Sequence, residues 1–255
     1  VSESILQTAL HSIRSEMEKG VSLGKLAVEQ KEQALARLVI ETDLEQAARS
    51  ADLIIEAIPE DMQLKADTFA RLDRTAPSGA ILASNTSSLS ITEMAAVTKR
   101  PRQFVGMHFF NPVHKMKLLE IVVGLETSPE TVQVAADVGR RMGKETVVIK
   151  ESPGFITSRI NAMIGNEAFY MLQEEIATAA DIDKAVKLGL NHPMGPFEMA
   201  DLVGLDTRLH VLEYLHQTLG EKFRPAPLMV QYVKAGRLGR KVGRGVYEYP
   251  PPEKK

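Results

Sequence analysis

The alternation of strand and helix is clearest in residues 52–90, which read DLIIEAIPEDMQLKADTFARLDRTAPSGAILASNTSSLS. The short apolar runs Leu53–Ile58 and Ala80–Ser84 are bounded by turn residues and predict two buried strands. Residues Asp61–Arg74 lie between them and predict a helix. A helix that connects two strands in this way is typical of a parallel sheet in the α/β class.

The alternation extends outward from this stretch. On its amino-terminal side we expect helices over Ser4–Lys19 and Ala27–Leu38, a strand over Leu38–Glu41 and a helix after Asp43. On its other side we expect a helix from Ser90, strands around His108 and Glu120, a helix over Ser128–Met142 and a strand over Thr146–Ile149. After Pro153 the pattern is helical, with one long helix between Ile156 and Ile176 and shorter helices over 181–188, 197–202, 207–219 and 228–235. We therefore expect a βα domain in residues 1–151 and an all-helical domain in residues 152–255.

The composition narrows the class of protein. The chain has 255 residues, 44% of them hydrophobic and 25% charged, with a net charge of −2. This balance is typical of a globular protein and lacks the basic excess of a nucleic-acid binder. No apolar run approaches the roughly 18 residues of a membrane span. The absence of cysteine excludes disulfides and thiolate metal sites and fits a reducing cytoplasm. We therefore expect neither a nucleic-acid nor a membrane partner.

Two further apolar segments carry a titratable pair. His108 lies in MHFFNPV (107–113), and Glu120 lies in KLLEIVV (117–123). Both segments predict strands, and the Asn111-Pro112 step between them is a turn signal. A histidine in an apolar strand is more often a core residue than a catalyst. A carboxylate beside an imidazole, however, fixes its tautomer and supports the charge that the ring gains on accepting a proton, so the pair predicts a general base.

Polar side chains directly follow two of the predicted strands. Glu60 comes after the first strand, and Lys65 lies one turn into the next helix. Acidic residues also suit the start of a solvated helix, an alternative of about equal weight. In the functional interpretation, Glu60 and Lys65 bind ribose hydroxyls and phosphates, because open α/β sheets bind ligands beyond the carboxyl ends of their strands. Residues Asn85–Ser88 follow the second strand and either form turns and caps or hydrogen-bond a ligand.

The remaining histidines and a glycine-rich segment give weaker signals. His114 follows the turn after His108 and is expected to line the same site, whereas His192 is expected to be a turn residue. The other histidines have no partner at metal-ligand spacing, so no metal site is predicted. The basic segment Gly239–Gly245 matches neither common phosphate-binding pattern, and a surface tail is the alternative to phosphate binding.

Short motifs run in one order along the whole chain. They are EAI (56–58) with Glu60, SNTSS (84–88), HFFNP (108–112), KLLE (117–120), PGF (153–155), HPMGP (192–196), DLVGLD (201–206), and Lys241 with GRG (243–245). In this order the chain resembles the bacterial L-3-hydroxyacyl-CoA dehydrogenases, and within them the 3-hydroxybutyryl-CoA dehydrogenases. The resemblance implies a Rossmann-like doubly wound sheet followed by an all-α domain. We also expect a homodimer formed through the helical domain.

The resemblance further implies the reaction and the residues that carry it. The reaction is the NAD-dependent oxidation of the 3-hydroxyl group of an acyl-CoA to a 3-keto group. His108 would take the hydroxyl proton, and Glu120 would orient and support the imidazole. Ser87 matches a position whose hydroxyl contacts substrate and cofactor. The positions that match cofactor contacts are Glu60, Lys65, Asn111 and Lys241.

Two departures from the family pattern stand out. Ser158 occupies a position where the family often has an asparagine that contacts the acyl group, and a shorter hydroxyl would act there through water. The chain also contains no G-x-G-x-x-G, the pattern that occupies the first strand-turn-helix unit in this family. Because that pattern is missing and the chain begins with Val1, we expect the sequence to start just after that unit of roughly 30 residues. We expect such a chain to bind NAD weakly.

Two other interpretations stay open on the sequence alone. If the missing unit is essential, the chain is a non-catalytic acyl-CoA-binding or structural protein. A sugar-acid dehydrogenase on the same scaffold is the second alternative, since substrate choice depends on few residues.

Overall fold

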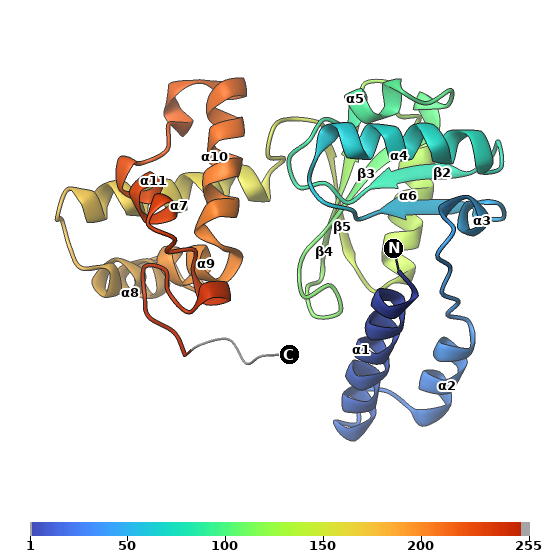
Figure 1. The fold of residues 1–255 in the computed structure, drawn as a ribbon, viewed down its shortest axis with the longest axis horizontal. Coiled ribbons are helices and arrows are strands. Elements are labelled where there is room, and N and C mark those ends of the chain that lie inside the picture. Colours follow the sequence, from blue (N-terminus) through green and yellow to red (C-terminus); the bar gives the residue numbers. More distant parts are fainter. Residues whose placement is uncertain (1, 251–255) are drawn as a thin grey trace.

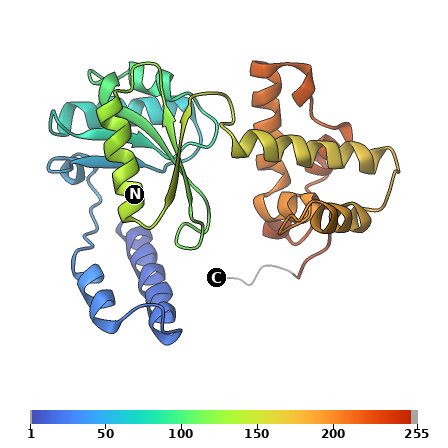
Figure 2. The ribbon, with the colours of Figure 1, turned by 180° about the vertical axis from the view of Figure 1, so that it is seen from behind.

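A computed structural model describes residues 2–250, so Val1 and the last five residues of the predicted helical domain lie outside the described part. A half that contains the strands is followed by a half built from helices (Figure 1). A single segment leads from the last strand of the first half into the long helix of the second, and the same two halves lie side by side when seen from behind (Figure 2). The predicted order of a βα half and a helical half is confirmed.

One five-stranded sheet forms the centre of the first half, with its strands in chain order. The strands are β1 (Leu53–Glu56), β2 (Ile81–Ser84), β3 (Phe104–Phe109), β4 (Leu118–Val123) and β5 (Glu145–Lys150). The pairs β1/β2, β2/β3 and β4/β5 are parallel, whereas β3 and β4 pair antiparallel. The sheet is therefore mostly parallel, as predicted, with one reversal where the chain turns between His108 and Glu120.

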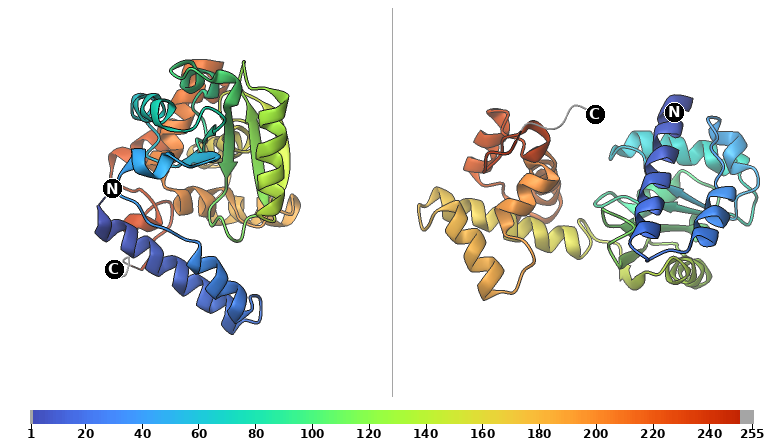
Figure 3. Two further views of the ribbon diagram at one scale, coloured as in Figure 1. Left: turned by 90° about the vertical axis from the view of Figure 1, so that its right-hand side faces the viewer. Right: turned by 90° about the horizontal axis from the view of Figure 1, so that it is seen from below.

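Helices cover both faces of the sheet (Figure 3, left). They are α4 (Met62–Thr75), α5 (Ile91–Ala96) and α6 (Pro129–Arg141), with the short 3-10 helix η1 (Pro101–Gln103) before β3. On one face Phe69 of α4 and Met94 of α5 pack with Phe104 of the sheet. On the other face Ala135 of α6 packs with Met107. Because alternate strand residues point to opposite faces, helices on the two faces together bury most positions of the central strands β2, β3 and β4.

The first helices make few contacts with the sheet. α1 (Glu3–Ser22) and α2 (Val28–Ala36) form a hairpin that extends away from it and buries none of its own residues (Figures 1 and 3). The short α3 (Leu44–Ala48) follows, with Asp43 capping its start. The predicted strand Leu38–Glu41 is wrong, because these residues form no strand and Val39 is 83% exposed. An apolar run becomes a strand only where a neighbour supplies backbone partners and a face to bury.

Up to residue 250, the second half is built from helices, with isolated β-bridges at Arg244 near its end. They are α7 (Thr157–Gln173), α8 (Ala179–Gly189), α9 (Pro196–Val203), α10 (Leu205–Leu219) and α11 (Pro227–Lys234), with the 3-10 helices η2 (Glu221–Phe223) and η3 (Arg240–Val242). Their shared core contains Phe169, Phe197, Leu212 and Leu215, each at most 1% exposed. Within residues 2–250 no helix has the combination of length and apolar character that crossing a membrane requires.

Candidate active site

The antiparallel pairing of β3 and β4 sets His108 directly opposite Glu120. The imidazole Nδ1 lies 2.7 Å from Oε2 of Glu120, and the two residues are 6% and 1% exposed. Thr157, the first residue of α7, donates its backbone N–H to Oε1 of Glu120 at 3.2 Å and its hydroxyl to Oε2 at 3.3 Å. Because Nδ1 faces a fixed carboxylate, the ring is held in the tautomer whose Nε2 can accept a proton.

A cavity of about 300 Å³ lies beside His108, where the two halves meet. Its lining comprises Asn85, Ser87, His108, Phe109, Phe110, Asn111, Thr157, Ser158, Asn161, Val203, Thr207, Arg208 and Val211. Four residues of the predicted site, Ser87, His108, Asn111 and Ser158, therefore share one cavity. Loops that follow β2 and β3 supply Ser87 and Asn111, and His108 lies near the end of β3, as expected for ligand binding at the carboxyl ends of strands.

A second, larger cavity of about 550 Å³ adjoins the first. It is mostly apolar, with Leu118, Ile164 and Met199 in its lining. His192 also lines this cavity, a position that the sequence did not predict for it. The residues common to both cavities are Phe110, Asn111, Thr157, Asn161, Val203 and Arg208. A substrate with a polar reacting end and an apolar extension fits such a pair of cavities.

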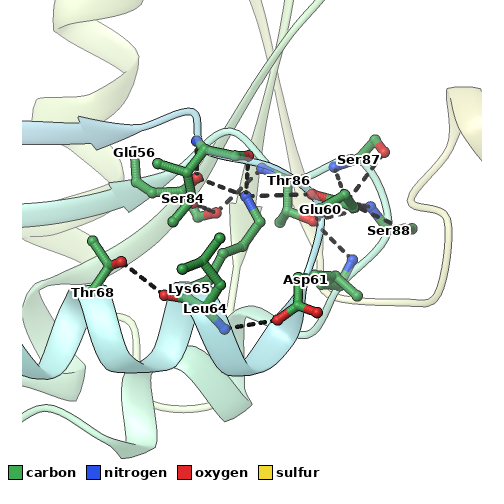
Figure 4. A network of polar contacts seen from close by, with 12 residues as sticks. Glu56, Glu60, Asp61, Leu64, Lys65, Thr68, Ser84, Thr86, Ser87 and Ser88 are labelled. Atoms are coloured by element: carbon green, nitrogen blue, oxygen red, sulfur yellow. Dashed lines mark hydrogen bonds and ion pairs between the residues drawn. The ribbon is translucent and has the colours of Figure 1, made fainter. Parts of the chain in front are cut away.

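Glu60 organises the loop that carries Ser87 (Figure 4), a residue of the cavity lining. Its Oε1 accepts hydrogen bonds from the Thr86 hydroxyl at 2.6 Å, from the Ser87 backbone N–H at 3.0 Å and from the Ser88 backbone N–H at 3.3 Å. Burial raises the pKa of this carboxyl, but the bond from Thr86 and the charge of Lys65 outweigh it, so the pKa lies below its ordinary value. Glu60 is thus an ionised anchor for the Ser87 loop.

Lys65 lies beneath the strand ends and not at their surface. Its side chain is 1% exposed, and its Nζ is 2.6 Å from Oε1 of Glu56, 3.4 Å from Oε2 of Glu60 and 3.3 Å from the Ile58 carbonyl (Figure 4). These contacts use the donors of the ammonium group within the protein. The placement differs from the expected direct contact with phosphates and favours a supporting role, in which Lys65 neutralises two carboxylates under the site.

Lys241 is held in the helical half, away from the cavity lining. Its Nζ is 2.6 Å from both carboxylate oxygens of Asp206 at the start of α10. The segment around it is anchored, because Asp201 accepts the backbone N–H groups of Val246 and Tyr247, both at 2.9 Å. The described part of the glycine-rich segment is therefore packed against the helical core, and the alternative of a loose surface tail is wrong for it.

Asn161 and Arg208 lie at the site and were not singled out from the sequence, whereas Asn85 belongs to the predicted polar cluster Asn85–Ser88. Asn161 lies three positions after Ser158 on α7, so helical spacing was a usable signal for it. Asn85 accepts the backbone N–H of Phe109 at 2.8 Å and links the ends of β2 and β3. Arg208 carried no local signal, because only the packing of α10 brings it beside His108.

Other histidines and metal ligands add little to the site. His114 lies outside the cavity lining, with 53% of its side chain exposed and Nε2 3.4 Å from Glu16, so its predicted place in the site is wrong. Among residues 2–250 no group of three or more histidine, aspartate or glutamate side chains is arranged to hold a metal ion. The site can carry out proton transfer at His108. The neighbouring hydroxyl, amide and guanidinium groups can bind oxygen atoms of a ligand.

Comparisons with known proteins agree with this geometry. The family profile "3-hydroxyacyl-CoA dehydrogenase, NAD binding domain" matches residues 1–152, and the profile "3-hydroxyacyl-CoA dehydrogenase, C-terminal domain" matches residues 154–249. The chain is 45% identical over 250 residues to a probable 3-hydroxybutyryl-CoA dehydrogenase of Bacillus subtilis, covering 98% of this chain and 87% of that protein. It is 42% identical over 250 residues to the 3-hydroxybutyryl-CoA dehydrogenase of Bradyrhizobium diazoefficiens, with coverage of 98% and 85%.

The crystal structure of (S)-3-hydroxybutyryl-CoA dehydrogenase PaaH1 from Ralstonia eutropha has a similar fold. It superimposes with a TM-score of 0.94 at 42% identity, covering 98% of this chain and 88% of that one. The NAD-domain profile matches from residue 1, which does not support the expectation that the chain starts after the first unit of that domain. With both halves matched and a histidine–glutamate pair at their junction, the chain belongs to the 3-hydroxyacyl-CoA dehydrogenase family.

Proposed function

We propose that this chain oxidises the 3-hydroxyl group of L-3-hydroxyacyl-CoA thioesters to a keto group with NAD, and that 3-hydroxybutyryl-CoA is its substrate. The observation that carries the proposal is the pair of His108 and Glu120, 2.7 Å apart, at the wall of a polar cavity that opens into an apolar one. The names of the Bacillus subtilis and Bradyrhizobium relatives support the choice of a short acyl chain.

His108 acts as the general base in this proposal. Its Nε2 takes the proton of the 3-hydroxyl group, and the ring becomes positive. Glu120 holds Nδ1–H throughout and stabilises that positive charge, while Thr157 keeps the carboxylate in place. Burial of the pair strengthens this electrostatic support, because the local dielectric is low.

The polar ends of the strands fit a nicotinamide nucleotide. Ser87 and Asn111 supply hydroxyl and amide groups to the cavity beside His108, and such groups hydrogen-bond ribose and carboxamide oxygens. Bound there, NAD supplies the acceptor for the hydride that leaves C3. Ser158 would contact the acyl group from α7, and Glu60 with Lys65 would hold the Ser87 loop in position. Lys241 would contact the cofactor only through a rearrangement of its pair with Asp206.

The test is turnover by the purified chain. We expect the absorbance of reduced nicotinamide to grow with L-3-hydroxybutyryl-CoA and NAD, and to stay at background with the D isomer. Acyl-CoA binding by calorimetry without any turnover would favour a non-catalytic acyl-CoA-binding protein instead. Turnover of a sugar acid with none of the thioester would favour the other alternative.

We further propose that the molecule consists of an NAD-binding domain in residues 1–151 and a helical domain in residues 152–255, and that two copies pair through the helical domain. Support for the pairing comes from α7, where Ile160 is 56% and Met163 38% exposed, because apolar groups of this size favour burial against a partner. Light scattering tests it. We expect a dimer for the wild type and a monomer for Ile160→Glu.

A cytoplasmic location is proposed as well, supported by a sequence without cysteine. Fractionation of the source cells with an antibody to the chain tests this location, and recovery with membranes or in the medium would contradict it.

A further inference from the structure

One strongly basic group at the site has no acidic partner. Arg208 lies in the first turn of α10 and lines both the cavity beside His108 and the larger apolar cavity. Among the described residues, no carboxylate lies within ion-pair distance of its guanidinium, whereas the buried Lys65 and the partly buried Arg100 each pair with a carboxylate. A cation withdrawn from water without a counter-charge is costly, so its retention at a cavity wall points to a ligand.

The guanidinium of Arg208 is oriented by Asn161 on α7. With the amide oxygen of Asn161 facing the guanidinium, that oxygen accepts from Nη2 at 2.7 Å and from Nη1 at 3.2 Å. In the opposite orientation the amide nitrogen of Asn161 would face the guanidinium, and both of these groups only donate hydrogen bonds. Burial lowers the pKa of Arg208 to about 10, so the group stays charged at neutral pH. An arginine has five N–H donors, and a contact with one amide oxygen leaves several of them for a ligand.

The substrate class offers one oxygen atom that fits this position. In a 3-hydroxyacyl thioester the carbonyl carbon C1 and the hydroxyl-bearing carbon C3 are separated by a single methylene carbon. When the hydroxyl is bound by His108, the carbonyl must therefore lie in the same cavity, within reach of another lining residue. The phosphates of coenzyme A are separated from the thioester by the whole pantetheine arm, which places them outside a cavity of about 300 Å³.

We propose that Arg208, held by Asn161, binds the thioester carbonyl oxygen and thereby fixes the 3-hydroxyl group against His108. The inference rests on the proposed function and assigns a specificity-determining residue to that site. A charged donor would replace the contact that Ser158 is too short to make alone, because Ser158 and Asn161 lie on the same face of α7. A bidentate guanidinium restricts the rotation of the carbonyl more than a single hydroxyl does.

Binding of two coenzyme A derivatives tests the proposal without NAD or turnover. Butyryl-CoA carries the carbonyl oxygen, whereas S-butyl-CoA has a methylene group in its place. By calorimetry we expect the wild type to bind butyryl-CoA about tenfold to a hundredfold more tightly, the range for one hydrogen bond to a charged group. Arg208→Met should bind both derivatives equally. Arg71→Met, at an exposed arginine of α4, is the matched control and should keep the wild-type preference.

Three outcomes would overturn the proposal. Equal affinity of the wild type for the two derivatives would show that no group of the protein binds the carbonyl oxygen. An unchanged preference in Arg208→Met would assign the contact to another residue. A wild type that favours glutaryl-CoA over butyryl-CoA, with the preference lost in Arg208→Met, would assign Arg208 to a carboxylate at the end of the acyl chain.

A conservative variant and a kinetic measurement extend the test. With them, the outcome depends neither on whether Arg208→Met folds nor on whether the chain oxidises its substrate. If Arg208→Met fails to fold, Arg208→Lys carries the test, since one ammonium group keeps the charge but loses the fork geometry and should retain only part of the preference. Where the wild type turns over L-3-hydroxybutyryl-CoA, Arg208→Met should raise KM about tenfold or more. Inactivity of the wild type would count against the proposed oxidation, while the binding preference would still decide the role of Arg208.

Discussion

The two halves of the molecule each bury a carboxylate that is 1% exposed, and the two carboxylates are used differently. In the sheet half, Glu120 accepts from His108 and Thr157, and His108 reaches a cavity. In the helical half, Asp201 accepts from two backbone N–H groups at 2.9 Å and from the Tyr249 hydroxyl at 3.0 Å. Burial alone therefore does not mark a catalytic carboxylate.

The partner of the carboxylate makes the difference. A carboxylate bound to an imidazole at a cavity wall can support a change of charge during a reaction. A carboxylate bound to backbone amides closes hydrogen bonds that the C-terminal segment needs in order to fold. Gly245 shows how closely that segment is fitted, because an added Cβ would lie 2.0 Å from Oδ1 of Asp201. We accordingly expect substitutions at His108 and Glu120 to change reaction rates, and substitutions at Asp201 to change stability.

The largest effect is expected for His108→Asn. The asparagine amide can still donate to Glu120 from near the position of Nδ1, but no base remains at the position of Nε2. Turnover should fall about 10²- to 10⁴-fold, while the free energy of unfolding changes by less than about 1 kcal/mol. Initial rates and urea denaturation of the same preparation measure both quantities. A rate near that of the wild type would mean that another group takes the proton.

Asp201→Asn should give the reverse result. The amide nitrogen of the new side chain only donates hydrogen bonds, and it would face a backbone N–H group that also donates. The hydrogen bonds from Val246 and Tyr247 therefore cannot both be kept. We expect the free energy of unfolding to fall by about 2–3 kcal/mol, with kcat of the folded fraction unchanged. Urea denaturation, followed by rate measurements well below the unfolding transition, checks this. A slow but fully stable variant would contradict the assignment.

Glu120→Gln should fall between these two variants. The glutamine oxygen can still accept Nδ1–H, so the ring keeps its tautomer, but the negative charge that supports the imidazolium is lost. We expect kcat to drop about tenfold to a hundredfold with little change in KM, because Glu120 does not line the cavity. Steady-state kinetics separates the two parameters. A rise in KM alone would mean that Glu120 acts on binding and not on the proton transfer.

The sequence predicted the pair of His108 and Glu120 better than the contacts of Asp201. The strand patterns around His108 and Glu120 and the turn between them were sufficient to predict a hairpin that sets the two residues close together. The end of a parallel strand likewise predicted that Ser87 would lie at a ligand site, whereas Asn111 was expected there from the family resemblance. These inferences work because strand pairing and strand ends follow from local pattern and topology.

Contacts between helices were not readable in the same way. Arg208 reaches the cavity through the packing of α10, and Asp201 meets Val246 only after the chain turns back on itself. Lys65 was expected to contact the ribose or phosphates of a ligand, but Glu56 and Glu60 hold it beneath the strand ends. The apolar run at Leu38–Glu41 failed as a strand for a related reason, since only tertiary structure supplies a partner.

The smallest effect should be on the pH dependence of stability under acid conditions, where the carboxylates of the two halves contribute with opposite sign. The pKa of Glu60 is lowered in the folded chain, so its ionised form contributes stability that is present above the ordinary value of about 4.3 and is lost as the pH falls. Burial raises the pKa of Asp183, which accepts from Phe197 and Tyr247, so its contribution is present below about 3.9 and is lost as the pH rises. Urea midpoints between about pH 3 and pH 7 should therefore diverge in opposite directions when the wild type is compared with Glu60→Gln and with Asp183→Asn. Parallel curves for the two variants would show that the carboxylates of both halves respond to protons alike, and the contrast between the halves would then rest on geometry alone.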